Sequence, residues 1–144
     1  MKKTNKLPKF SAVIIVTDRN QLALQKRDSK PNIANPGKVT VFAGAADKRE
    51  RPIDCARREI KEELGLPIKR ADLRFLGKWI SNSIFWKKKL QGYVYVLNNI
   101  DPNNLKLSEG EKIIYIKKNK MELVKLDMPD FSKKVLLKYL EKGD

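Results

Sequence analysis

The sequence predicts a layered α/β or α+β fold in which helices cover the faces of a mixed β-sheet. Three observations lead to this fold class. The 144 residues suit one domain, which we expect to span residues 1–144, and 41% of them are apolar, enough to fill a core. Short β-branched and apolar runs alternate with polar turns, which is typical of strands. Two longer segments, residues 52–64 and 130–142, space their apolar residues as helices do.

The first part of the chain predicts a β-hairpin, a loop and a further strand. The loop is the segment DSKPNIANPG, residues 28–37, whose Pro, Asn and Gly content is typical of irregular connections. The other expected elements are a strand over residues 10–17, a turn over residues 18–20, a strand over residues 22–25 and a short strand over residues 39–42. The last strand leads into Ala43-Gly44-Ala45.

The helix over residues 52–64 has recognisable ends. Pro52 suits the first helical turn, where a missing N–H costs nothing, and Gly65 ends the helix. The apolar residues of this helix form one stripe that should pack on the sheet: Ile53, Ala56, Ile60 and Leu64.

The rest of the chain predicts three more strands and two helices. The strands are residues 72–80, 90–97 and 113–116, and the helices are a short one over residues 119–124 and a C-terminal one over residues 130–142. The C-terminal helix is amphipathic. Its expected core-facing residues are Phe131, Val135, Leu136 and Leu140.

The chain carries a large excess of positive charge. Lysine and arginine total 32 against 17 acidic residues, which gives a formal net charge of +15. This excess fits an anionic partner such as polyphosphate, a nucleotide or RNA, although a lysine-rich composition alone also explains it. No run approaches the roughly 18 apolar residues of a membrane span, so we expect no membrane partner.

The counts of histidine and cysteine exclude several kinds of chemistry. The chain has no histidine, which excludes histidine-based triads and histidine metal sites. It has one cysteine, Cys55, so no intrachain disulfide can form, and a reducing, cytoplasmic setting is expected. Cys55 is expected to be a small buried residue. Zinc is disfavoured, and any metal would need oxygen ligands.

Three glutamates gather near the C-terminal end of the helix over residues 52–64. Glu59, Glu62 and Glu63 are spaced i, i+3, i+4 and share a face, and Glu63 borders the apolar stripe. Acids there oppose the helix macrodipole at roughly 0.3–1 kcal/mol each. A divalent cation would reverse this cost, since carboxylates suit Mg²⁺ or Mn²⁺. The helix by itself also allows a plain solvated charged face.

Residues upstream of the helix decide between these interpretations. The segment GAADKRERPIDCARREIKEELGL, residues 44–66, matches the signature of the Nudix hydrolases. The matching residues are Gly44, Glu50, Arg58, Glu59, Glu62, Glu63 and Gly65. At background frequencies of roughly one in fifteen each, seven such residues would coincide by chance about once in 10⁸. The chain therefore resembles the Nudix hydrolase family, whose members have about this length, so the resemblance can cover the whole chain.

The resemblance implies both a fold and a reaction. Nudix hydrolases fold as an α/β/α sandwich with a mixed β-sheet. They hydrolyse the pyrophosphate bond of a nucleoside diphosphate linked to another group, with Mg²⁺ or Mn²⁺ as cofactor. By resemblance, Glu62 and Glu63 would be the principal metal ligands. Glu59 would be a further ligand or would contact the water, and Glu50 would act close to the metals.

The resemblance also suggests roles for residues that hold no metal directly. Arg58 would orient the glutamates by salt bridging, and Gly44 would let the backbone approach the metal. A carboxylate would take the proton of the attacking water. In family members this base lies either within the signature, where Glu63 is the candidate, or in a later loop. Glu109 and Glu111, in the stretch LSEGEKIIYI, are the candidates in the later loop, and a polar turn is the alternative.

Substrate contacts are expected outside the signature. The stretch LALQKRDSKPNIANPGKVTVFAGAAD resembles a Nudix subgroup in which Arg27 would face the phosphates, with a surface cation as the alternative. Phe85, Trp86 and Trp79 could stack on a base or pack in the core. The chain departs from the family where Arg49 replaces a frequent glycine.

Two other functions remain open at this point. One is a Nudix-fold module that binds a nucleotide or RNA without cleaving it, which the positive charge would suit. The other is an enzyme that acts on the 5′ end of RNA with the same metals.

Overall fold

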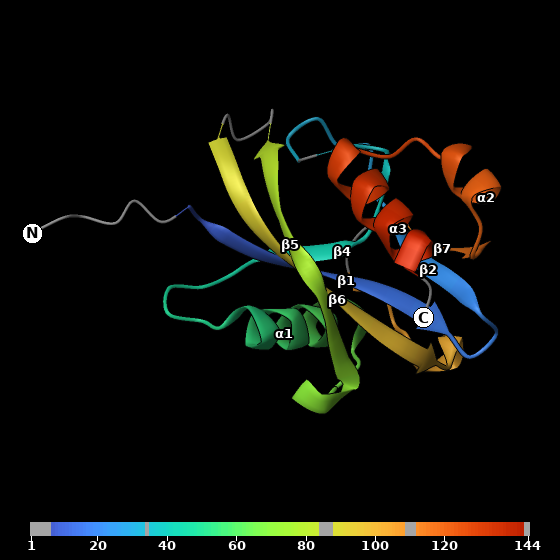
Figure 1. Ribbon diagram of the computed structural model, residues 1–144, viewed down its shortest axis with the longest axis horizontal. Coiled ribbons are helices and arrows are strands. Elements are labelled where there is room, and N and C mark those ends of the chain that lie inside the picture. Colours follow the sequence, from blue (N-terminus) through green and yellow to red (C-terminus); the bar gives the residue numbers. More distant parts are fainter. Residues whose placement is uncertain (1–6, 34, 84–87, 109–111, 143–144) are drawn as a thin grey trace, which may run out of the picture.

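The computed structural model describes residues 7–33, 35–83, 88–108 and 112–142, which form a mixed β-sheet covered by helices on both faces (Figure 1). The strands are β1 Lys9–Thr17, β2 Gln21–Lys26, β3 Val39–Thr40, β4 Phe42–Ala45, β5 Leu73–Ser83, β6 Lys88–Ile100 and β7 Lys112–Lys117. The helices are α1 Pro52–Leu64, α2 Lys120–Val124 and α3 Asp130–Lys142, with short 3-10 turns η1 Arg70–Asp72 and η2 Pro102–Asn104. The expected mixed α/β architecture is confirmed.

The sheet is organised around β1. Its main path has the order β3-β2-β1-β6-β5, while β4 also pairs with β1 and β7 also pairs with β2. β1 runs parallel to β6 and antiparallel to β2 and β4. Residues 11–17 of this strand are all buried. Burial on both faces explains why the strand appears in the sequence as an unbroken apolar run.

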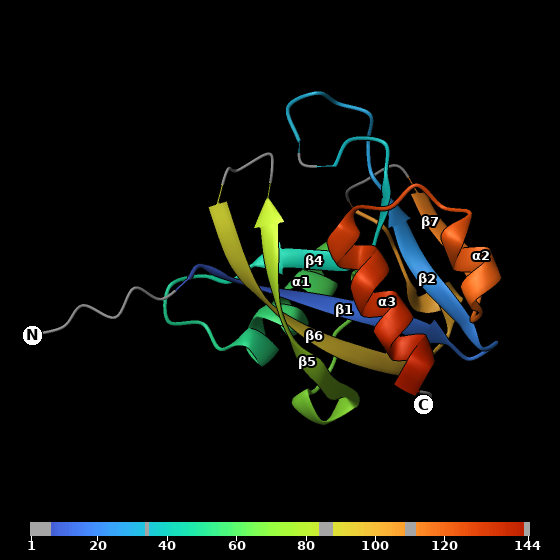
Figure 2. The same ribbon diagram turned by 45° about the horizontal axis from the view of Figure 1, so that its top comes forward.

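Alternate residues of β1 contribute to two separate hydrophobic cores, because successive side chains point to opposite faces of a sheet. Ala12 and Ile14 belong to the core that is shared with α3. Val13 and Ile15 belong to the core that is shared with α1. Figure 2 shows the result: α1 lies behind the sheet, and α2 and α3 lie in front of it. The layers are therefore α/β/α, as the resemblance implied.

Helix α1 has the ends that the sequence predicts. Pro52 occupies its first turn, and Gly65 follows its last residue in the left-handed conformation, with φ of 64°. Gly65 donates a backbone hydrogen bond to the Lys61 carbonyl at 2.9 Å. The apolar stripe packs on the sheet as expected: Ala56, Ile60 and Leu64 are fully buried, and Ile53 packs against the same core.

The short strand expected over residues 39–42 is wrong in one respect, because the chain changes partners within it. β3 pairs with β2, whereas β4 pairs with β1. Val41 lies between the two strands, and its N–H donates to the Ser132 hydroxyl of α3 at 3.2 Å. The hydroxyl accepts a hydrogen bond from the buried Val41 N–H, which has no strand partner where the pairing changes. This switch directs the following residues, Gly44 and Ala45, toward α1.

Other elements differ from expectation mainly in length. β5 begins after the 3-10 turn η1 and extends to Ser83, and β6 is longer than expected at both ends. In α3, Val135 and Leu136 are buried and Phe131 and Leu140 pack against the core, as predicted. Tyr139 is also buried, which the sequence analysis did not anticipate. Among the described residues, no helix is long and apolar enough to cross a membrane.

The packing of α1 makes a direct prediction about stability. Ile60→Ala should lower the free energy of unfolding by about 2–5 kcal/mol, because it removes fully buried methyl groups and leaves a cavity beneath the helix. Urea denaturation followed by circular dichroism measures this loss. The neighbouring exposed residue supplies the control: Lys61→Ala should change the same quantity by less than about 0.5 kcal/mol. Equal losses in the two variants would contradict the packing described here.

Candidate functional site

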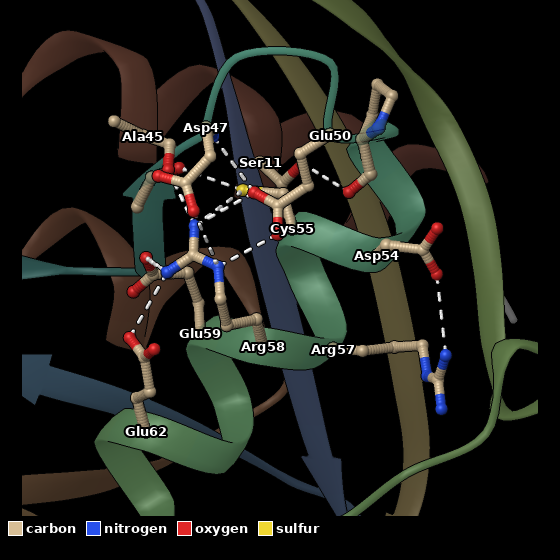
Figure 3. A network of polar contacts seen from close by, with 12 residues as sticks. Ser11, Ala45, Asp47, Glu50, Asp54, Cys55, Arg57, Arg58, Glu59 and Glu62 are labelled. Carbon is tan, nitrogen blue, oxygen red and sulfur yellow. Dashed lines mark hydrogen bonds and ion pairs between the residues drawn. The ribbon is translucent and has the colours of Figure 1, made fainter.

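The side chain of Arg58 is the centre of a network of acidic residues on the exposed side of α1 (Figure 3). Its Nε donates to Glu50 Oε2 at 2.8 Å, and its Nη2 donates to Glu50 Oε1 at 2.9 Å. Nη2 also donates to the Ala45 carbonyl of β4 at 2.9 Å. The paired contacts fix both the distance and the plane of the Glu50 carboxylate, which is how a guanidinium binds such a group most strongly.

The other end of the same guanidinium binds two glutamates of its own helix. Nη1 of Arg58 donates to Glu59 Oε1 at 3.0 Å and to Glu62 Oε2 at 3.2 Å. Glu59 has 14% of its side chain exposed, whereas Glu62 has 58% exposed. Glu63, the next residue, has 9% of its surface exposed and lies on the buried side. The carboxylate of Glu62 is thus exposed to solvent, whereas those of Glu59 and Glu63 lie within or beside the core.

The loop between β4 and α1 brings Glu50 to Arg58. The Asp47 N–H donates to Glu50 Oε1 and the Glu50 N–H donates to the Asp47 carbonyl, both at 3.0 Å. Asp47 Oδ2 lies 3.7 Å from Arg58 Nε. Arg49 has φ of 69°. This left-handed conformation is the one that glycine adopts most easily, which is consistent with the glycine that the resemblance leads us to expect at this position.

Gly44 allows the buried carboxylate of Glu59 to lie against β4. A Cβ atom added at this position would collide with the Glu59 carboxyl group, so no larger residue fits without displacement. The carbonyl of Gly44 accepts a hydrogen bond from the Cys55 thiol at 3.4 Å. Burial raises the pKa of this thiol to about 11, so it stays protonated and remains a donor at neutral pH. Cys55 is fully buried, as predicted.

Proton affinities within the network follow from these contacts. Hydrogen bonding to Arg58 holds the pKa of Glu50 below its usual value. Burial raises the pKa of Glu59, although the nearby Arg58 opposes the shift. The contact with Glu50 in turn raises the pKa of Arg58. The two glutamates therefore differ: one is held as an anion by its cation, and the other is destabilised as an anion by desolvation.

The acidic residues have the type of donor atom that a hard divalent cation binds. At least one of their side chains would have to move before a cation could bind. Carboxylate oxygens are the donors that Mg²⁺ and Mn²⁺ prefer. As placed, the described side chains contain no group of three or more acidic or cysteine residues arranged around a common point where a cation could lie. Arg58 lies between them instead. Glu62 is the most exposed of the three glutamates that contact Arg58, and a rotation of its side chain would bring its carboxylate away from the guanidinium.

Asp54, another acid of α1, belongs to a separate ion pair. Its carboxylate accepts hydrogen bonds from Arg70 at 2.8 and 2.9 Å and lies 3.4 Å from Arg57. The contact with Arg70 lowers the pKa of Asp54. Since Arg70 begins the turn η1, this pair ties the connection after α1 back to the helix. We therefore assign Asp54 to the scaffold.

A cavity of about 500 Å³ lies on the α3 side of β4. Gly44 and Ala45 line it, and these same residues contact Glu59 and Arg58 respectively. The rest of the lining includes aromatic side chains, polar groups and cations from several elements, among them Phe10, Trp79, Phe131, Gln25, Arg27 and Lys38. The cavity and the acidic network are therefore joined through two residues of β4.

The structure brings together most of the residues that the sequence singled out. Glu50, Arg58, Glu59 and Glu62 form one network, and Arg27 and Trp79 line the adjoining cavity. Gly44 lies against Glu59, and Glu63 lies on the buried side of α1. Four other predicted site residues lie outside the described residues: Phe85, Trp86, Glu109 and Glu111. Sequence reasoning missed the Ala45 carbonyl and the buried cavity residue Gln25, because neither backbone acceptors nor cavity walls leave a sequence pattern.

Solved structures of several proteins share this fold. A MutT protein from Methanosarcina mazei Go1 superposes with a TM-score of 0.77 at 16% identity, over 97% of this chain and 97% of that one. The dihydroneopterin triphosphate pyrophosphohydrolase of E. coli gives 0.74 at 13% identity, over 98% and 100%. A MutT NUDIX hydrolase from Burkholderia pseudomallei gives 0.70 at 20% identity, over 93% and 98%. At such identities the likeness shows the fold alone.

Family membership rests on a separate match. The family model for the NUDIX domain matches residues 7–138, which include the whole acidic network and the cavity. Together with the spacing of Gly44, Glu50 and the glutamates of α1, this match shows that the chain belongs to the NUDIX family.

Proposed function

We propose that this protein is a divalent-metal-dependent nucleotide pyrophosphohydrolase and that residues 1–144 form one Nudix hydrolase domain. The observation that carries the proposal is the junction at Gly44 and Ala45, where the acidic network meets the cavity. A substrate held in the cavity would have its charged portion next to the carboxylates. The E. coli protein of similar fold is itself described as a triphosphate pyrophosphohydrolase, which supports the reaction class.

Glu62 and Glu63 are the proposed principal ligands of Mg²⁺ or Mn²⁺. Glu59 is proposed as a further ligand or a contact to water, with Glu50 close by and the Gly44 backbone within reach. When bound, such a cation neutralises phosphate charge and lowers the pKa of a coordinated water. The proposal is consistent with the burial of Glu59 and Glu63, because a desolvated carboxylate interacts more strongly with an added positive charge than an exposed one does.

The other proposed roles belong to groups that hold no metal. Arg58 keeps the carboxylates oriented, since its guanidinium bonds three of them at once. Arg27 and Lys38 line the cavity and supply positive charge for the phosphates. A carboxylate accepts the proton of the attacking water. Glu63 within α1 and Glu109 or Glu111 in the later loop are the proposed candidates for that base.

The cavity favours a substrate with a flat organic group. Phe10, Trp79 and Phe131 offer aromatic surface against which a base can stack, and Gln25 and Asn35 offer hydrogen-bonding groups for its edges. A nucleoside diphosphate linked to another group meets both requirements. We also propose a cytoplasmic setting, because a chain with one cysteine forms no intrachain disulfide.

A second candidate function follows from the net charge of +15. Such a charge would favour RNA, either as a ligand that is not cleaved or as a substrate whose 5′ end is hydrolysed. The intact set of glutamates favours hydrolysis over binding alone.

A panel of substrates tests the reaction class. Nucleoside triphosphates, nucleotide sugars, dinucleotides and 5′-triphosphorylated or capped RNA are each incubated with Mg²⁺ or Mn²⁺, and products are separated by anion-exchange chromatography. We expect a nucleoside monophosphate or a 5′-monophosphorylated RNA from at least one of them, and no product in EDTA. Binding of RNA with a steep salt dependence, and no product from any member of the panel, would favour the binding module instead.

Removal of a ligand charge tests the metal assignment. Glu62→Gln and Glu63→Gln should each lower kcat/KM by at least roughly 10–100-fold. Loss of a group that only contacts a metal ligand already costs this much, and a direct ligand should cost no less. In EDTA the free energy of unfolding of Glu62→Gln should change by less than about 0.5 kcal/mol, because this exposed residue loses its ion pair with Arg58 and its repulsion from Glu59 together. Glu122→Gln, on α2, is the matched control and should keep wild-type kinetics. Full activity in both α1 variants would overturn the assignment.

A methyl group at Gly44 tests the role of the close approach. Gly44→Ala should displace the Glu59 carboxylate and lower turnover at least tenfold, with only a small loss in the free energy of unfolding, because the group that must move is the end of a flexible side chain. The double variant Gly44→Ala/Glu59→Ala removes the colliding carboxylate. It should regain stability, by urea denaturation, without regaining turnover. Wild-type turnover in Gly44→Ala would show that Glu59 does not need its present position.

A further inference from the structure

The C-terminal end of α1 is closed by a segment that lies far away in the sequence. The N–H of Lys106 donates to the Leu64 carbonyl at 2.9 Å, and the N–H of Ser108 donates to the Glu63 carbonyl at 2.8 Å. The Ser108 hydroxyl lies 2.6 Å from the Glu62 carbonyl and 3.2 Å from that of Glu63. One residue therefore contacts the backbones of both proposed principal metal ligands.

These contacts complete the hydrogen bonding of the helix end. The last four carbonyls of an α-helix have no partner within the helix. Here the Lys61 carbonyl accepts from Gly65, and the next three, those of Glu62, Glu63 and Leu64, accept from Ser108 and Lys106. A glycine cap alone would leave the Glu62 and Glu63 carbonyls to water. The tertiary contact fixes the backbone from which both of these carboxylates project.

Neighbouring leucines hold the segment in place. Leu105 and Leu107 pack against the core that α1 shares with the sheet, and Lys106 and Ser108 alternate with them on the exposed side. The packing of Leu107, the residue before Ser108, therefore anchors the backbone that carries the Ser108 hydroxyl. The N–H and the hydroxyl of Ser108 also point at the negative end of the helix dipole. That negative end otherwise disfavours carboxylates in the last turn.

We propose that Ser108 is a positioning residue for the metal site: its hydroxyl fixes the backbone of the Glu62–Glu63 turn of α1, from which both carboxylates would reach a divalent cation. Ser108 touches neither the cation nor the substrate in this role, and acts through the two carbonyls. The inference rests on the proposed function, since it needs a cation at Glu62 and Glu63. Loss of the hydroxyl should therefore weaken cation binding itself, apart from any effect on turnover.

The test measures Mn²⁺ binding to the full chain without substrate. Titrations followed by electron paramagnetic resonance give the Kd of Mn²⁺ for the wild type, Ser108→Ala and Ser108→Thr. We expect Ser108→Ala to raise the Kd about tenfold, which is the scale on which lost outer-sphere partners weaken metal sites. Ser108→Thr keeps a hydroxyl and should stay within about twofold of the wild type. Urea denaturation in EDTA measures the stability of each variant separately.

A cap on another helix supplies the matched control. The Asn119 side chain accepts a hydrogen bond from the Glu122 N–H at 2.8 Å and caps α2, on the opposite face of the sheet from α1. Asn119→Ala should lower stability as Ser108→Ala does, because each removes one hydrogen bond at a helix end, yet it should leave the Kd of Mn²⁺ unchanged. If Ser108→Ala does not fold, Ser108→Val replaces it, since valine matches threonine in shape and lacks the hydroxyl.

The outcomes separate this inference from the proposed function. A wild-type chain that binds no Mn²⁺ would overturn both. A wild-type chain that binds Mn²⁺ while Ser108→Ala binds it equally well would overturn the role of Ser108 alone and leave the metal site standing. Equal weakening in Ser108→Ala and Asn119→Ala would assign the effect to general stability and would also overturn the inference.

Discussion

The arrangement of the acidic site depends on the guanidinium of Arg58. It bonds Glu50 with two nitrogens and reaches Glu59 and Glu62 with a third, so it gathers three carboxylates from a loop and two helical turns. A lysine at this position would be a single point charge without the planar set of donors. One positive charge among these three glutamates and the nearby Asp47 leaves the site acidic within a strongly basic protein. That local deficit of positive charge is what a divalent cation would offset.

The scaffold positions this network by holding α1 against β1 and β4. Ser11 of β1 donates to the Pro52 carbonyl at 2.6 Å at the start of the helix, and Ser108 binds the carbonyls at its end. Between them, the apolar stripe of α1 packs on the sheet. β4 reaches the helix because the segment stops pairing with β2 at Val41 and pairs with β1 from Phe42 on. This change of partner brings the Gly44 backbone beside Glu59. Small residues and hydroxyl groups thus set the distances at which the charged groups meet.

Much of this architecture could be predicted from local sequence. The stripe of Ile60 and Leu64, the ends of α1 and the grouping of Glu59 with Glu62 follow from helical periodicity, and the spacing from Gly44 to Gly65 indicated the family. The switch at Val41 could not be predicted, because it depends on which strand each half pairs with. The contact of Ser108 with Glu62 spans 46 positions, and no periodicity links residues that far apart.

The central claim is that the carboxylates of α1 hold a divalent cation, and anomalous diffraction tests it most directly. Crystals grown with Mn²⁺ would be measured on both sides of the manganese absorption edge. The account predicts an edge-dependent peak among the carboxylates of Glu59, Glu62 and Glu63, with oxygen atoms of at least two of them about 2.0–2.3 Å from it. A peak confined to other acids, such as Asp54, or no peak at saturating Mn²⁺, would contradict the account.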